Sequence, residues 1–200
     1  MKHPLDTAGL YLAWQAPFVD QKMAPLRRRN PGLPFERVLD VGCGPGVNAG
    51  AFAHTDYLGI DLDAGYIATA RARHGDRFLV GDAGNLQLPA GTAFDCVLVN
   101  SLLHHLDDAQ VRALLRSVRH VLLPGGAIHV IDLFVPEAMG LPRTLARADR
   151  GRYPRPLSDL RALLASECDI RGEEEFTLHL GALTLWRMVY FELGGNAPCA

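Results

Sequence analysis

The chain has 200 residues, 48% of them hydrophobic, and a formal net charge of −2 at pH 7. This length suits one domain with a sizeable core, and the small net charge argues against a dedicated nucleic-acid binder, which usually carries a basic excess. Since no apolar run approaches the roughly 18 residues of a membrane span and no export signal is recognisable, we expect a cytoplasmic protein without membrane or nucleic-acid partners. Cys43 and Cys96 are expected to be free thiols.

The first regular pattern lies in residues 8 to 29, where apolar and aromatic side chains recur at roughly helical spacing. We expect Pro17 and Pro25 to break the helix, because proline lacks a backbone N–H and clashes with the preceding turn. The segment is predicted to cover the edge of a sheet or its core.

Residues 38 to 46 are the most informative part of the chain. They read as a buried parallel strand that runs into glycines at every second position: Gly42, Gly44 and Gly46. Glycine permits a sharp turn and lets the backbone approach a ligand that any Cβ would block. The spacing, which begins at Asp40, differs from the Gly-x-Gly-x-x-Gly of dinucleotide-binding folds. A dinucleotide pattern that starts at Gly44 and accepts Ala49 as its last member stays open.

Four further apolar runs are predicted to be strands. They cover residues 57–63, 77–83, 94–100 and 126–132, with Asp61, Asp82, Asn100 and Asp132 at or near their ends. Polar residues at the carboxyl ends of successive strands are the expected layout of a ligand crevice in a doubly wound sheet.

Helices are predicted between these strands. Residues 47–54 and 63–74 form the first two, with Asp63 as a plausible N-cap. A third, amphipathic helix is capped by Asp107 or Asp108.

Residues 35 to 135 resemble the class I S-adenosylmethionine-dependent methyltransferases, whose first motif is similar to the glycine segment and whose later motifs follow in order at the strand ends. The resemblance implies S-adenosylmethionine as the cofactor. The site residues that it implies are Asp40, Gly42, Cys43, Gly44 and Gly46 for the methionine moiety, Asp61 for the ribose hydroxyls, Leu62, Asp82 and Ala83 for adenine, and Asn100 under the methionyl part.

The predicted fold class is α/β: a single doubly wound, Rossmann-like sheet of about seven strands, mostly parallel, with an antiparallel C-terminal hairpin strand. The hairpin is predicted because residues 176–180 and 184–192 are separated by a loop too short for a crossover. Residues 1–200 then form one methyltransferase domain. Its expected parts are an N-terminal helical cover (1–34), a cofactor-binding core (35–135), a lid and helix (136–167) and the hairpin (168–200).

His104 and His105 follow the fourth predicted strand and are the candidate catalytic residues, because imidazole takes up a proton near neutral pH. The alternative is that one orients the loop while the other packs on the next helix. Asp107 and Asp108 lie close enough to raise the question of a metal. However, adjacent side chains at a helix start point in different directions, and the acids serve better as caps, so no metal site is expected.

Two segments outside the core are expected to determine the substrate. The N-terminal helices carry Tyr11 and Trp14, and in the family such helices commonly lie over the crevice. The other segment, residues 142–156, is rich in arginine and includes Arg150, Tyr153 and, between them, Arg152. Arginine binds carboxylate or phosphate in a bidentate manner, which favours an acidic or phosphorylated substrate. A solvated loop is the alternative.

The expected function is transfer of a methyl group from S-adenosylmethionine to a small-molecule acceptor by in-line displacement, with an oxygen, carbon or nitrogen acceptor left open. Asn100 is followed by Ser-Leu-Leu rather than the Pro-Pro-aromatic sequence that marks methylation of nucleic-acid bases. A protein acceptor, a member of the fold that binds the cofactor without transferring its methyl group, and a nicotinamide-dependent oxidoreductase are the alternatives. The oligomeric state is left open.

Overall fold

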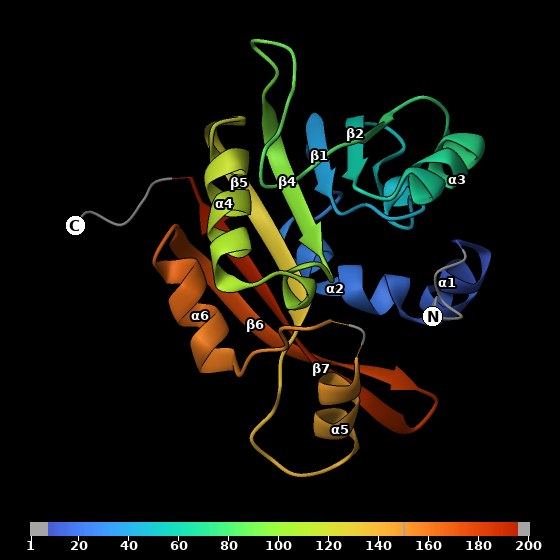
Figure 1. Cartoon of the computed structure of the whole chain (residues 1–200), viewed down its shortest axis with the longest axis vertical. Coiled ribbons are helices and arrows are strands. Elements are labelled where there is room, and N and C mark those ends of the chain that lie inside the picture. The colour runs from blue at the N-terminus through green and yellow to red at the C-terminus, as the bar shows by residue number, and fades with distance from the viewer. Residues whose placement is uncertain (1–7, 150, 196–200) are drawn as a thin grey trace.

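The computed structural model describes residues 8–149 and 151–195, which build a seven-stranded sheet with the strand order β3-β2-β1-β4-β5-β7-β6 (Figure 1). The parallel strands are β1 (Arg37–Val41), β2 (Asp56–Asp61), β3 (Phe78–Val80), β4 (Phe94–Asn100) and β5 (Leu122–Leu133). The antiparallel hairpin is formed by β6 (Asp169–Leu180) and β7 (Leu183–Gly194), and β7 pairs with β5. The predicted fold class is therefore confirmed.

The α-helices are α1 (Ala8–Gln15), α2 (Val19–Arg29), α3 (Ala64–His74), α4 (Asp108–Arg119), α5 (Leu141–Ala148) and α6 (Leu157–Ala165). Short 3₁₀ helices are η2 (Ala16–Phe18), η3 (Ala49–Phe52) and η4 (Leu103–His105). Asp63 caps α3 as predicted, accepting from the backbone N–H groups of Gly65 and Tyr66. Asp107, rather than Asp108, caps α4 in a reciprocal capping box with Gln110.

Three local predictions differ from the structure. Pro17 interrupts the N-terminal helix with the 3₁₀ turn η2, but Pro25 lies inside α2, where its ring is buried. Residues 47–54 form turns around the short η3 instead of an α-helix, because the side chain of Asn48 bonds inward to Asp40. The strand predicted at 126–132 is longer, because β5 begins at Leu122 and contains a bulge that separates the pairs of Leu122 and Ala127 with β4.

Both faces of the sheet are buried, which explains why its parallel strands read as continuous apolar runs. Successive residues of β1 alternate between two hydrophobic clusters: Val38 packs in one with Leu98 and Tyr190, and Leu39 in the other with residues of α4. In Figure 1 the arrowheads of β1 and β4 point toward α2, so the N-terminal helices lie beside the carboxyl ends of the central strands. This is the edge at which a ligand crevice is expected.

Three of the four cysteines lie in the part of the chain that the structure describes. Cys43, Cys96 and Cys168 are buried and free, whereas Cys199 lies outside the described residues. Within 8–149 and 151–195, no helix is long and apolar enough to span a bilayer.

Candidate active site

A cavity at this edge has a volume of about 480 Å³. It is lined by the end of β2, the segments after β1, β3 and β4, and the first turns of α4. Its lining residues include Gly42, Ile60, Asp61, Leu62, Asp82, Ala83, Gly84, Leu102, His105, Leu106 and Gln110. Five of the residues that the resemblance implied for the cofactor therefore surround one space: Gly42, Asp61, Leu62, Asp82 and Ala83.

Asp61 lies at the centre of this wall. Its Oδ2 accepts from the backbone N–H of Gly44 at 2.9 Å, and its Oδ1 accepts from that of Asp63 at 2.8 Å. Burial raises the pKa of this carboxyl, and the two N–H groups oppose that shift. A carboxylate has about four lone-pair sites, so Asp61 keeps acceptor capacity for two hydroxyls of a ligand. Beside it, the side chain of Leu62 is 70% exposed at the cavity wall, an apolar surface suited to a flat ring.

The glycines of the first motif are needed for the conformation of the loop itself, as well as for the approach of a ligand. Gly42, Gly44 and Gly46 all have positive φ angles, which side chains rarely adopt. A Cβ on Gly42 would lie 2.9 Å from the side chain of Leu102, and one on Gly46 would lie 3.0 Å from the ring of His74. The positive φ angles agree with the sharp turn expected from the sequence, and neighbouring side chains also crowd a Cβ at two of the three positions.

Asp40 lies beneath the glycine loop and is fully buried. Its Oδ2 accepts from the hydroxyl of Tyr57 at 2.7 Å and from the amide of Asn48 at 3.2 Å. Its Oδ1 has no hydrogen-bond partner among the described residues. Burial raises the pKa of Asp40 to about 6, although both hydrogen bonds lower it. Asp40 thus supports the loop from inside and does not line the 480 Å³ cavity.

A chain of buried hydrogen bonds continues from Asn48 toward the N-terminal helices. Asn100 donates to Oδ1 of Asn48 at 3.2 Å, and Oγ of Ser101 donates to Oδ1 of Asn100 at 3.1 Å. Nζ of Lys22 donates to Ser101 Oγ at 2.8 Å. Together with Gly42 and Cys43 these residues line a small cavity of about 20 Å³ that joins the glycine loop to α2.

A second large cavity, of about 220 Å³, lies between the N-terminal helices, η4, α5 and β7. Its lining residues include Trp14, Gln15, Phe18, Lys22, Ser101, His104, His105, Leu133, Leu145, Asp149, Leu178, Trp186 and Met188. The rings of Trp14, Phe18 and Trp186 meet edge to face, with centroids 5.4 to 6.3 Å apart. His105 lines this cavity and also the 480 Å³ cavity, so the two spaces meet at that residue.

His104 is buried between two carboxylates. Its Nδ1 lies 2.5 Å from Oδ1 of Asp132, and its Nε2 lies 3.1 Å from Oδ1 of Asp149. Burial lowers the pKa of His104, but the two carboxylates outweigh that effect and raise it to about 9. In return, the imidazolium holds the pKa of Asp149 at about 2 despite its partial burial. His104 is therefore a paired cation at neutral pH, with both nitrogens engaged.

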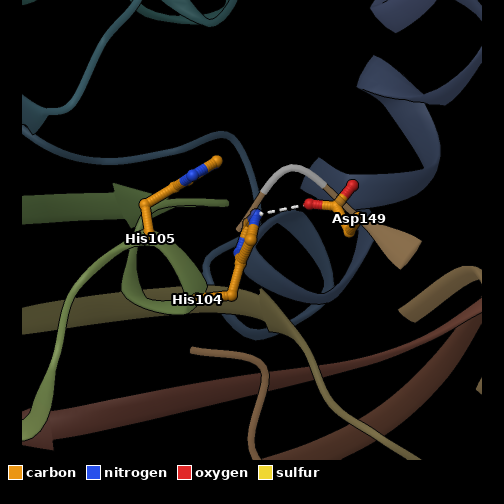
Figure 2. A group of neighbouring side chains, drawn as sticks. All are labelled: His104, His105 and Asp149. Atoms are coloured by element: carbon orange, nitrogen blue, oxygen red, sulfur yellow. Dashed lines mark ion pairs between the residues drawn. The ribbon is translucent and has the colours of Figure 1, made fainter. Parts of the chain in front are cut away.

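Figure 2 shows the imidazole of His104 directed at Asp149, with His105 beside it. These three residues offer ligand atoms within 4.8 Å of one another, close enough to hold a metal ion. A metal on Nε2 of His104 would have to displace the proton shared with Asp149, since Asp132 already occupies the other nitrogen. The geometry therefore fits an ion-paired cluster better than an open metal site.

The arginine-rich segment contacts the loop after β4 through Arg155. Arg155 donates to the carbonyls of Leu103 and Leu106 and pairs with Asp108, which fastens the loop after β4. Arg152 is exposed, Tyr153 is 40% exposed, and neither lines the two large cavities.

Two predicted substrate contacts cannot be followed: Arg150 and the side chain of Tyr11 lie outside the described residues. Trp14 does line the 220 Å³ cavity.

Sequence reasoning missed Lys22 and Asp149 as members of this site. Lys22 carried a weak signal, as a lone lysine in the N-terminal apolar helix. Asp149 carried no signal of its own, because only the folding of the loop after α5 brings it to His104.

The strand order and the mostly parallel pairing place the chain in the Rossmann-like class of α/β folds. Residues 38–126 match the family described as "Methyltransferase domain". This match supports the predicted resemblance to the class I S-adenosylmethionine-dependent methyltransferases, and with it S-adenosylmethionine as the cofactor.

Named relatives agree with this family. The chain is 35% identical over 109 residues to an uncharacterized methyltransferase of Mycobacterium tuberculosis, covering 52% of this chain and 54% of that protein. It is 33% identical over 141 residues to the O-methyltransferase rstn1 of Aspergillus nomiae, covering 64% of this chain and 62% of that protein. The chain thus spans about half to three-fifths of the length of these relatives.

Solved structures show the same fold. A S-adenosylmethionine-dependent methyltransferase of Methanosarcina mazei superposes with a TM-score of 0.68, at 18% identity, over 84% of this chain and 96% of that one. The glycopeptide N-methyltransferase MtfA complexed with S-adenosylmethionine gives 0.65, at 21% identity, over 88% and 86%.

Proposed function

We propose that this protein transfers the methyl group of S-adenosylmethionine to a small-molecule acceptor, with the cofactor in the 480 Å³ cavity and the acceptor in the 220 Å³ cavity. The observation that carries the proposal is that His105 lines both spaces. Methyl transfer requires a nucleophile, the methyl carbon and the sulfonium sulfur in line, which two adjoining cavities provide.

In this assignment Asp61 takes the ribose hydroxyls and Leu62 packs on the adenine. Asp82 and the backbone of Ala83 bind the adenine edge. The glycine loop and Asn100 hold the methionine moiety, which brings the methyl group to the junction near His105 and Ser101. The cofactor supplies the electrophilic methyl group, and the protein aligns it and excludes water.

The two histidines then have different roles. His104, paired with Asp132 and Asp149, positions the loop that carries its neighbour and is not available as a base. His105 is the one of the two that faces the reacting groups.

An oxygen acceptor is favoured over nitrogen or carbon. Three curated relatives are named O-methyltransferases, and MtfA, named as an N-methyltransferase, is similar only in fold at 21% identity. The small acceptor cavity argues for a small molecule, since pockets for drug-sized ligands measure about 300–1,000 Å³. Reaction in the cytoplasm, without a nucleic-acid or membrane partner, belongs to the same proposal.

The test uses S-adenosylmethionine with an isotopically labelled methyl group and a small-molecule extract of the source cells. We expect the label in a discrete small metabolite. The control is Leu62→Asp, which adds a carboxylate at the cavity wall where the side chain is exposed and no core contact is lost. Label in protein, or no label despite cofactor binding, would contradict the proposal and favour a protein acceptor or a member that does not transfer the methyl group.

A further inference from the structure

Lys22 is a buried cation between the 220 Å³ cavity and the glycine loop. It is 8% exposed, and it lines both the 220 Å³ cavity and the small cavity beside the glycine loop. Nζ donates to two neutral oxygens, Oε1 of Gln15 and Oγ of Ser101, each at 2.8 Å. No carboxylate of the described residues lies within ion-pair distance of it. A buried ammonium without a direct counter-ion is unfavourable, so its retention needs an explanation.

The charged groups that face Lys22 come from several elements. Asp132 on β5 and Asp149 after α5 both act on it through space, but each is already paired with His104. Burial lowers the pKa of Lys22 to about 8, and the two acids only partly oppose that shift. His104 and His105 of η4 complete the polar part of the cavity wall. His104 and its two carboxylates together carry a net charge of −1, which acts on Lys22 through space. Both carboxylates are bonded to His104, so the ammonium of Lys22 has no direct carboxylate partner among the described residues.

The strained backbone at Ser101 points to the same position. Ser101 has a positive φ of 57°, which is uncommon for a residue other than glycine. This conformation places its hydroxyl between Asn100 and Lys22. The lysine is thus tied to the residue that flanks the methionine site, at the place where the methyl group must cross into the acceptor cavity.

We propose that Lys22 anchors the acceptor, and that the acceptor is a small planar acid (a phenol, an enol or an aromatic carboxylic acid) whose ionised oxygen pairs with the ammonium. The proposal rests on the proposed function and names its substrate class. The walls of Trp14, Phe18 and Trp186 suit the flat ring, and Lys22 suits the oxygen. The proposal keeps the acidic substrate that the arginine-rich segment suggested, but Lys22 rather than an arginine pairs with it.

The acceptor oxygen can lose its proton either to Lys22 or before it binds. An acceptor hydroxyl gives its proton to the neutral amine of Lys22, or an acceptor already ionised meets the ammonium. Both routes give the same pair of oxyanion and ammonium. The oxygen then forms a bond to the methyl carbon as the bond from that carbon to sulfur breaks, giving the methyl ether or ester and S-adenosylhomocysteine. The product carries no charge on that oxygen, so its pairing with Lys22 is lost.

The experiment measures the ionisation of a bound probe, 4-nitrophenol, whose phenolate is coloured. The wild-type protein, loaded with S-adenosylhomocysteine to prevent turnover, is titrated with the probe over a range of pH. An opposite charge within about 4–6 Å favours the charged form by about 1–3 pKa units, so we expect the pKa of the bound probe to fall by that amount. Lys22→Met should abolish the shift and weaken phenolate binding roughly tenfold or more, whereas Lys22→Arg should keep much of it.

The matched control is Arg152→Met, which removes a cation from the exposed loop outside the cavity and should leave the shift unchanged. Equal affinity for S-adenosylhomocysteine shows that each variant is folded. Failure of the wild type to bind the probe, or an unshifted pKa of the bound probe, overturns the proposal whatever the variants do. An equal shift in Lys22→Met also overturns it. A labelled product that is an amine without an acidic group would contradict the role of Lys22 and leave methyl transfer intact.

Discussion

His104 illustrates at the scale of a residue what a sequence can and cannot predict. Its place after β4 was predictable, and so was a role for one of two adjacent histidines in orienting the loop. Its charge was not, because the charge depends on Asp132 and Asp149, which lie 28 and 45 positions further along the chain. The local sequence therefore predicts the same candidate role for both histidines, and only the partners of His104 in the fold distinguish them.

The pairing of His104 predicts a pH-dependent stability. The pKa of His104 rises from 6.5 to about 9 on folding, so its contribution is complete below 6.5 and is lost as the pH rises through 9. The pKa values of Asp132 and Asp149 fall from 3.8, so their contributions are present above 3.8 and are lost in stronger acid. His104→Gln should lower the free energy of unfolding by about 3–5 kcal/mol between these limits.

Urea denaturation of wild type and His104→Gln measures this difference at a pH near 6 and again above 9. We expect the difference to shrink at the higher pH, because His104 is then neutral in the native wild type. A difference that stays constant across this range would mean that His104 stabilises the fold by packing alone.

At the scale of elements, the loop after α5 closes over η4. Tyr153 donates its backbone N–H to the carbonyl of His104 at 2.9 Å, and Gly151 is buried against the same residue. A Cβ on Gly151 would lie 2.5 Å from that carbonyl oxygen and 2.3 Å from the imidazole ring. The sequence predicted a lid in residues 136–167 and a substrate contact from the arginines. What fastens the loop is instead a glycine contact, the pair of Asp149 with His104, and Arg155.

Gly151→Ala is therefore expected to displace the loop. The clash is with backbone, which cannot rotate away, and overpacking of this kind typically costs about 1–3 kcal/mol. Thermal unfolding should show a lower Tm, and turnover should fall because Asp149 and the wall of the acceptor cavity move. Gly50→Ala is the matched control, since a Cβ there meets nothing within 4 Å. Equal Tm values for the two variants would show that the loop is not fixed by this contact.

The sheet was predictable at the scale of the whole molecule because its signals are local. Each parallel strand is a short apolar run, and β4 (Phe94–Asn100) has the bounds that its pattern predicts. The hairpin followed from the length of one loop. The acceptor cavity was not predictable, because α1, η4, α5 and β7 each contribute one part of its wall, and no sequence pattern records their juxtaposition.

The cofactor half of the site was predictable, because it is built at the ends of neighbouring parallel strands. Asp61 and Asp82 take their places from the ends of β2 and β3, and the parallel register of these strands brings those ends together. The resemblance supplied their roles, and the sheet topology supplied their proximity. Asp40 followed the same pattern but lies beneath the loop, since side chains of a strand alternate between the two faces.

The central claim is that S-adenosylmethionine binds in the cavity at Asp61, and calorimetric titration tests it most directly. We expect the wild type and Asp56→Ala, an exposed acid at the other end of β2, to bind one equivalent of S-adenosylmethionine, and neither to bind a nicotinamide dinucleotide. Asp61→Ala should bind roughly tenfold or more weakly, because charge-assisted hydrogen bonds to the ribose and to Gly44 are lost. Binding of the dinucleotide in place of S-adenosylmethionine, or equal affinity in Asp61→Ala, would contradict the assignment of this site.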